Sequence, residues 1–166
     1  MGKQEILSKI LPKGRGVWVP IDHGVTDFPS QGLEDIESTI NSLIAGEVDA
    51  IVAHKGVVDK FSHLCEGTKT SMIAHLSAST RHGGKYQSNK VLVGDVDEVI
   101  MRGAVGVSCQ LNIGSKKESE MLERMGHITT EAYLNDVPVL GMVYVRGENV
   151  NLMKSDSTKG YAHAAR

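Results

Sequence analysis

The chain of 166 residues is poor in aromatic residues and cysteine, and no long apolar run occurs in it. Aromatic residues make up 4% of the chain and its net charge is −2, so the basic surface typical of nucleic-acid-binding proteins is missing. No apolar stretch approaches the ~20 residues that cross a bilayer, and the N-terminus lacks the apolar core of a secretory signal. Cys65 and Cys109 stand far apart without a Cys-x-x-Cys motif, which predicts two incidental thiols in a reducing cytoplasm.

Short apolar runs recur along the chain, and they are continuous instead of strictly alternating. Such runs are typical of parallel strands with both faces covered. They predict strands at residues 17–21, 48–53, 72–76, 104–111 and 137–143, with a brief one at 91–93.

Helical patterns lie between these strands, at residues 33–45, 96–102 and 115–134. Asp95 is the expected N-cap of the second of these helices. A last helix is expected over 158–166, after an N-cap at Asp156 or Ser157. This order predicts a single α/β domain with a parallel sheet and right-handed crossovers. Five main strands do not close a barrel, so the chain is either an open sheet or the front part of a larger barrel.

The stretch 17–24 reads Val-Trp-Val-Pro-Ile-Asp-His-Gly, so an apolar strand ends in an acid, an imidazole and a glycine. A buried parallel strand delivers its C-terminal residue to the loop face where α/β enzymes place their chemistry. Asp22 is therefore a candidate general acid or base, and Gly24 lets the backbone pass close to a ligand. The structural alternative is that Asp22 caps a turn while His23 is hydrogen-bonded in a loop.

A second strand end carries Tyr144, followed by Val145, Arg146 and Gly147. A phenol titrates near ~10 when unperturbed, and it is suited to protonate an alkoxide. The Arg146 guanidinium can hold a phosphate or carboxylate through paired hydrogen bonds. Read structurally, the same residues are a tyrosine at the rim of the sheet and an arginine in a surface ion pair.

Lys55 is the lysine that directly follows a clear strand, in the segment His54-Lys55-Gly56. A Schiff-base lysine needs a desolvated site that lowers its pKa. Binding of an anionic substrate and a plain ion pair are the two other roles open to Lys55.

Three histidines, His23, His54 and His75, lie at or near the ends of three successive strands. Three imidazoles there can hold zinc, as in metal-dependent hydrolases or aldolases, but no His-x-His or His-Glu-x-x-His motif supports a metal. The sequence also lacks a Walker loop, a Gly-x-Gly-x-x-Gly and a Gly-x-Ser-x-Gly. We therefore expect neither a metal nor another cofactor.

Six motifs together carry a resemblance that no one of them carries alone. They read Pro-Ile-Asp22-His-Gly-Val, His54-Lys-Gly, His75-Leu-Ser, Leu111-Asn-Ile-Gly-Ser115, Met142-Val-Tyr144-x-Arg-Gly and Tyr161-Ala-His-Ala-Ala-Arg166. In order and spacing this succession resembles the archaeal-type class I aldolases, over the whole length of the chain. The resemblance implies a TIM (β/α)8 barrel that forms an imine between a lysine and a ketose phosphate without a metal.

Roles for individual residues follow from the resemblance alone. Asp22 matches the proton acceptor of the family and Tyr144 matches its proton donor. Contacts to the sugar phosphate are implied for two stretches, Asp22, His23, Gly24, Val25 and Thr26, and Tyr144, Val145 and Arg146. The family forms ring-like homo-oligomers, so a homo-oligomer is expected.

Two departures from the family pattern matter. Val145 stands where the family has proline, which implies a less firmly held Tyr144. The imine-forming lysine of the family lies on the sixth strand, beyond Arg166, so by resemblance the chain is the first five β/α units of an eight-unit barrel. We therefore expect residues 1–166 alone to be inactive as a Schiff-base aldolase. A non-catalytic remnant that pairs its sheet edges with another chain is the alternative.

Three positions indicate a branch within the family. Met142 stands where the fructose-bisphosphate aldolases have Trp, and His75-Leu-Ser77 stands where they have Leu-Asn-Gly. The thiolase branch lacks Tyr144. These points favour the branch that transfers a carbon unit from a deoxy-hexodiulose phosphate to aspartate semialdehyde, an early step of an alternative route to 3-dehydroquinate and the aromatic amino acids. A fructose-bisphosphate aldolase is the alternative.

Overall fold

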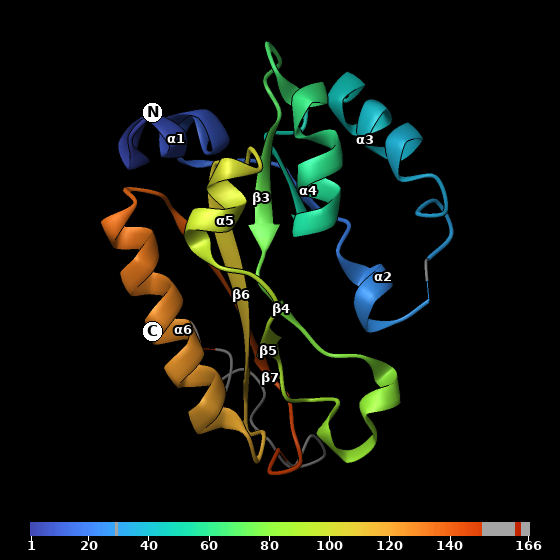
Figure 1. The fold of residues 1–166 in the computed structure, drawn as a ribbon, viewed down its shortest axis with the longest axis vertical. Coiled ribbons are helices and arrows are strands. Elements are labelled where there is room, and N and C mark those ends of the chain that lie inside the picture. Colours follow the sequence, from blue (N-terminus) through green and yellow to red (C-terminus); the bar gives the residue numbers. More distant parts are fainter. Residues whose placement is uncertain (29, 151–161, 164–166) are drawn as a thin grey trace.

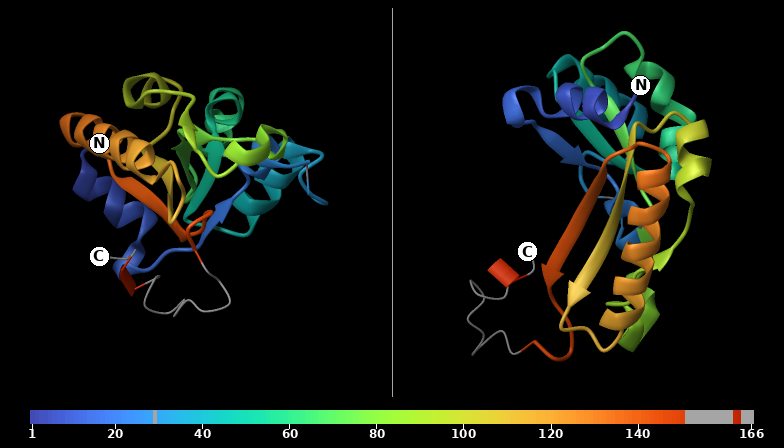
Figure 2. Two further views of the ribbon diagram at one scale, coloured as in Figure 1. Left: turned by 90° about the horizontal axis from the view of Figure 1, so that it is seen from below. Right: turned by 90° about the vertical axis from the view of Figure 1, so that its left-hand side faces the viewer.

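The computed structural model describes residues 1–28, 30–150 and 162–163. Its main feature is a sheet of five parallel strands, which curves with most of its helices on the outer side (Figures 1 and 2). The strands are, in spatial order, β1 (Trp18–Pro20), β2 (Ala50–His54), β3 (Ser71–His75), β6 (Gly106–Ile113) and β7 (Val139–Val145). The predicted parallel sheet is therefore confirmed, with β1 and β7 at its edges.

Four helices follow or connect these strands, namely α3 (Ile36–Ala45), α4 (Lys55–Phe61), α5 (Val96–Met101) and α6 (Glu118–Leu134). The helix α3 begins at Asp35, whose side chain accepts a hydrogen bond from the Ser38 backbone N–H at 3.0 Å. Asp95 occupies the N-cap position of α5 as predicted, but its side chain makes no capping hydrogen bond. Two further helices are α1 (Lys3–Ile10) and the short α2 (His23–Thr26).

The predicted strand at 91–93 does not join the main sheet. It forms β5 (Val91–Leu92), which pairs antiparallel with β4 (Ser77–Ala78) in a separate ribbon. Three short 3₁₀ turns complete the described elements, at Pro12–Gly14, Ser62–Cys65 and Arg81–Tyr86. The last helix predicted over 158–166 lies outside the described residues except for residues 162 and 163.

The core fills the space between the sheet and its helices. Its largest fully buried side chains include Ile51 and Met72 of the strands and Ile128 of α6. The helix α1 adds Ile10 to this core at the N-terminal ends of the strands, opposite the loops that follow them (Figure 1). Each such aliphatic side chain contributes about 1.5–3 kcal/mol by leaving water. Within the described part of the chain, no helix is long and apolar enough to cross a membrane.

Candidate active site

The strand register gathers polar side chains on one face of the sheet. His54 of β2 lies beside His75 of β3, and His75 lies beside Ser108 of β6. Further along β6, Asn112 lies beside Tyr144 of β7. Partners in a ladder point to the same face, and so do alternate residues of one strand. The register therefore directs Tyr144 to the same face as His54 and His75.

Asp22 reaches this face from the other edge of the sheet. It follows β1 and is the N-cap of α2, and its Oδ2 lies 3.7 Å from Nε2 of His75. The Asp22 side chain is 16% exposed, so it is accessible at the strand ends yet packed beside an imidazole. The two residues with predicted acid–base roles thus come from opposite edge strands and face a common side.

His75 is the buried centre of the cluster. Its Nδ1 lies 2.6 Å from Ser108 Oγ, and its Nε2 lies 3.3 Å from Ser77 Oγ. Burial lowers the pKa of His75 to about 4, although the Asp22 carboxylate opposes that shift. The imidazole is therefore neutral at pH 7, lies beside the Asp22 carboxylate at 3.7 Å, and has its hydrogen-bonding partners in Ser108 and Ser77.

The three histidines do not form a metal site. His54 and His75 are adjacent, with ring centroids 5.3 Å apart, and His54 Nδ1 lies 3.1 Å from the His75 carbonyl oxygen. Burial lowers the pKa of His54 as well, against the opposing charge of Asp22. His23 is exposed in α2. Among the described residues, no three His, Cys, Asp or Glu side chains are grouped as a metal ion requires.

Lys55 is held by an ion pair. Its Nζ lies 3.0 Å from both carboxylate oxygens of Glu98, and that pairing lowers the pKa of Glu98. Of the three roles that the sequence left open for Lys55, this contact is the plain ion pair. Its side chain does not line either of the two cavities described next.

Two cavities open at the strand ends. Asp22, Gly24 and Val25 of the predicted substrate contacts line one of about 240 Å³, together with His54, and Thr26 and Arg146 line the other. The remaining predicted contacts, His23, Lys55, Tyr144 and Val145, line neither cavity. The larger cavity, of about 600 Å³, has twelve lining residues: Thr26, Thr80, Arg81, Gly84, Lys85, Gln87, Ser88, Lys90, Asn112, Arg146, Gly147 and Glu148. Its volume accommodates a small phosphorylated sugar.

Tyr144 and Arg146 are held in the continuing strand. The Arg146 guanidinium lies 4.8 Å from the centroid of the Tyr144 ring, a cation–π distance. Val145 lies beside Ile113 in the ladder, and the Arg146 N–H donates to the Ile113 carbonyl oxygen at 2.9 Å. The backbone around Tyr144 is thus fixed by strand pairing, although Val145 replaces the proline of the family.

Lys90 is the site residue that sequence reasoning missed. Its side chain is buried, with the residue 6% exposed, and its Nζ donates to Thr26 Oγ1 at 3.3 Å. Burial lowers the pKa of Lys90, the Asp22 carboxylate opposes this, and Arg146 adds to the lowering. The Lys90 ammonium therefore interacts with the groups of both edge strands. Lys90 precedes β5, and because β5 runs antiparallel, its first residue lies at the loop end where parallel strands finish.

A family model described as DeoC/LacD family aldolase matches residues 17–166. The chain belongs to this aldolase family. The resemblance drawn from the six motifs is therefore confirmed at the level of the family.

Two curated relatives of this aldolase-family chain are synthases. It is 35% identical to 2-amino-3,7-dideoxy-D-threo-hept-6-ulosonate synthase 1 of Archaeoglobus fulgidus, over 100% of this chain and 60% of the relative. It is 36% identical to 2-amino-4,5-dihydroxy-6-oxo-7-(phosphonooxy)heptanoate synthase of Streptomyces griseus, over 80% of this chain and 48% of the relative. The chain thus spans about half to three-fifths of the length of the curated relatives it matches.

Solved structures of class I aldolases share the fold. A Schiff-base-forming fructose-1,6-bisphosphate aldolase superposes with a TM-score of 0.81 at 24% identity, over 97% of this chain and 64% of that chain. An archaeal fructose-1,6-bisphosphate aldolase with its catalytic lysine bound to a carbinolamine intermediate gives a TM-score of 0.79 with the same coverage. The five parallel strands and their helices therefore have the architecture of a TIM-barrel aldolase, as the sequence predicted.

Proposed function

We propose that this chain carries the acid–base half of a class I aldolase that resembles 2-amino-3,7-dideoxy-D-threo-hept-6-ulosonate synthase. In this proposal the substrates are a ketose phosphate and aspartate semialdehyde, in the alternative route to 3-dehydroquinate and the aromatic amino acids. The observation that carries the proposal is that Asp22 lies beside a neutral His75 and that Tyr144, from the opposite edge strand, points to the same face of the sheet. Relatives at 35–36% identity with synthase names support the choice of substrates.

Asp22 acts as the base in cleavage. A lysine imine on the ketose phosphate accepts electrons, so the carbon–carbon bond breaks when a carboxylate removes the proton of the adjacent hydroxyl. The bond electrons enter the iminium and form an enamine, while the hydroxyl carbon leaves as a carbonyl compound. His75, which lies 3.7 Å from the Asp22 carboxylate, is neutral and so does not form an ion pair with it.

Tyr144 acts as the acid in the synthetic direction. The enamine carbon attacks the aldehyde carbon of aspartate semialdehyde, and the aldehyde oxygen becomes an alkoxide. The Tyr144 phenol donates a proton to that oxygen. The Arg146 guanidinium lies over the Tyr144 ring, 4.8 Å from its centroid, and packs against the phenol from that side.

The imine-forming lysine belongs, in this proposal, to sequence that follows residue 166. The test is borohydride reduction of the full-length protein with a ketose phosphate, followed by peptide mapping. We expect a stable adduct on a lysine outside residues 1–166 and none on residues 1–166 expressed alone. An adduct on Lys55 or Lys90, or no adduct at all, would contradict the proposal.

Substrate choice is tested separately, because a fructose-bisphosphate aldolase is the second candidate. Solved aldolases of that specificity share this fold, and a relative from Thermoproteus tenax is 25% identical over 93% of this chain and 58% of its own length. We expect product from deoxy-hexodiulose phosphate with aspartate semialdehyde and little cleavage of fructose 1,6-bisphosphate. The reverse preference would assign the second candidate, and activity with neither would favour a non-catalytic protein.

A homo-oligomer in the cytoplasm is the remaining part of this proposal, and it follows from the resemblance. Light scattering on the purified full-length protein tests the assembly. A monomer at micromolar concentration would contradict it.

A further inference from the structure

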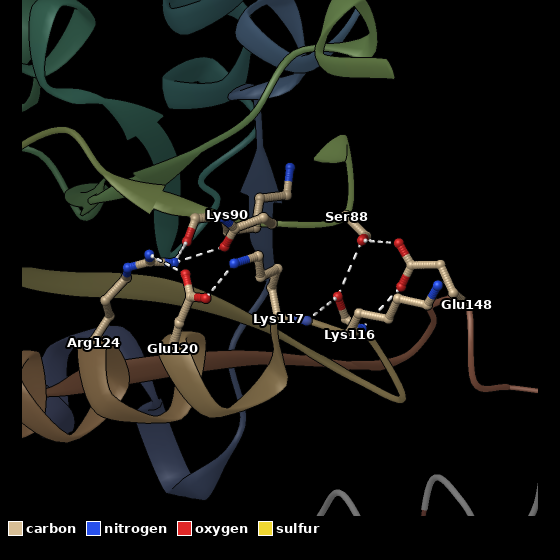
Figure 3. Close-up of polar contacts among 9 residues, drawn as sticks. Ser88, Lys90, Lys116, Lys117, Glu120, Arg124 and Glu148 are labelled. Atoms are coloured by element: carbon tan, nitrogen blue, oxygen red, sulfur yellow. Dashed lines mark hydrogen bonds and ion pairs between the residues drawn. The ribbon is translucent and has the colours of Figure 1, made fainter. Parts of the chain in front are cut away.

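The larger cavity carries an excess of positive charge. Its wall contains four basic side chains and one acidic side chain, namely Arg81, Lys85, Lys90, Arg146 and Glu148. Arg81 is ion-paired with Asp27. Glu148 accepts hydrogen bonds from Ser88 Oγ at 3.0 Å and from the Lys116 N–H at 2.9 Å (Figure 3). The Glu148 carboxylate is thus bound by Ser88 and the Lys116 N–H, and no ion pair with Lys90 or Arg146 is formed.

Among the described residues, neither Lys90 nor Arg146 makes a direct ion pair with a carboxylate, although the Asp22 charge acts on Lys90 from a longer distance. The Lys90 ammonium donates to the neutral hydroxyl of Thr26, and the Arg146 guanidinium stacks on Tyr144. Both cations line the same cavity, where they repel each other. The Asp22 charge offsets only part of the cost of burying the Lys90 ammonium, because the pKa of Lys90 is still lowered by burial, and the nearby Arg146 cation adds to that cost. An anion bound between the two would remove both penalties.

The main chain at Lys90 is anchored so that its side chain reaches the cavity. Arg124 of α6 donates to the Lys90 carbonyl oxygen and to Asn89 Oδ1, each at 2.7 Å, and it also pairs with Glu120. Figure 3 shows the Lys90 side chain extending away from Arg124 and Glu120, with its Nζ at the far end. A main chain fixed in this way presents the ammonium with little loss of conformational freedom on binding.

We propose that Lys90 and Arg146 form a two-cation subsite that binds an oxyanion of the substrate, a carboxylate or a phosphate, in the larger cavity. The planar Arg146 guanidinium can pair with two oxygens of such a group, and the Lys90 ammonium, which lines the same cavity, supplies a point charge. Thr26 and Asn112 line the same cavity and offer neutral hydrogen-bonding groups. Lys90 thereby becomes a specificity-determining residue. This inference rests on the proposed aldolase function, which it deepens.

The first experiment measures steady-state kinetics of full-length Lys90→Met, with Lys90→Arg and Lys60→Met as controls. Lys90→Met keeps the length of the side chain and removes the charge, Lys90→Arg keeps the charge, and Lys60 is an exposed lysine of α4. We expect Lys90→Met to raise KM about 10- to 100-fold, the range of a lost charged hydrogen bond. Lys90→Arg should stay within a few-fold of wild type. An unchanged KM in Lys90→Met would overturn the subsite.

Substrate analogues identify which oxyanion is bound. If Lys90 binds the acceptor carboxylate, the Lys90→Met effect disappears with a neutral aldehyde in place of aspartate semialdehyde. If it binds the donor phosphate, the effect disappears with the unphosphorylated ketose. Either result supports the subsite and names its ligand. An effect that persists unchanged with both analogues would show that Lys90 does not bind an oxyanion.

A third measurement is independent of turnover, so it separates failure of the subsite from failure of the proposed function. Inorganic phosphate and acetate are titrated into each full-length variant by calorimetry. Binding that is present in wild type and Lys90→Arg but lost in Lys90→Met supports the subsite, even where borohydride traps no imine. Equal heats in all variants would refute it, even if the imine forms. Thermal unfolding of each variant shows that Lys90→Met is folded.

Discussion

At the scale of single residues, His75 shows how burial sets a protonation state. It is 2% exposed, and its pKa of about 4 lies below the ordinary value of 6.5. The unfolded chain therefore binds a proton in the window between these two values that the folded chain does not bind. The contribution of the neutral His75 to the free energy of unfolding is fully present above about pH 6.5 and is lost as the pH falls toward 4.

This linkage predicts a destabilisation of up to about 3 kcal/mol between pH 7 and pH 4 from His75 alone. Urea unfolding of the full chain at pH 7, 6 and 5 measures it. His75→Gln is the control, because glutamine does not titrate and should flatten the pH dependence in that window. An equal slope of stability against pH in both proteins would contradict the assignment.

Lys55 and Lys90, the two lysines near the strand ends, differ in their contacts, and substitutions should therefore affect them differently. Lys55 is paired with Glu98, and the two side chains are 39% and 27% exposed. Lys90 is buried, donates to the Thr26 hydroxyl and makes no direct ion pair with a carboxylate among the described residues. We expect Lys55→Met to lower stability by less than about 1 kcal/mol, because solvent screens such a pair, and to leave KM unchanged. A raised KM would assign Lys55 to anion binding instead, and thermal unfolding beside substrate titration measures both quantities.

At the scale of elements, the sequence predicted the parallel strands correctly, but it predicted neither the helix α4 nor the antiparallel direction of β5. The five apolar runs predicted five parallel strands, and therefore that Asp22 and Tyr144 lie at the C-terminal ends of their strands. The sequence did not predict α4, because Gly56 and the two valines that follow it are weak helix formers. In the structure, burial of Val58 and Phe61 overrides that weak helix propensity. Lys90 was missed because no local signal shows that β5 runs antiparallel.

The helix α6 acts on the site through Arg124. This side chain donates to the Asn89 side-chain oxygen and to the Lys90 main-chain carbonyl, across 34 to 35 residues of sequence, and is itself held by Glu120. We expect Arg124→Met to raise KM about 3- to 10-fold with kcat nearly unchanged. Arg124 acts on the substrate only through the position of Lys90, and the loss of such a hydrogen bond costs about 1 kcal/mol. Glu120→Gln should give a smaller shift in the same direction. A fall in kcat at constant KM would show that Arg124 affects the chemical step instead.

At the scale of the whole molecule, the two edges of the sheet govern behaviour in solution. Within the described residues β1 pairs with β2 alone and β7 pairs with β6 alone, so each edge presents unpaired backbone groups. Parallel strands are normally covered on both sides, and open edges template association.

We expect residues 1–166 expressed alone to self-associate with rising concentration, whereas a chain extended by further β/α units to the length of its relatives stays at one defined size. Light scattering across a dilution series measures this, with Val19→Lys on β1 as a variant that discourages edge pairing. A concentration-independent monomer of residues 1–166 would mean that these edges are protected by the described fold itself.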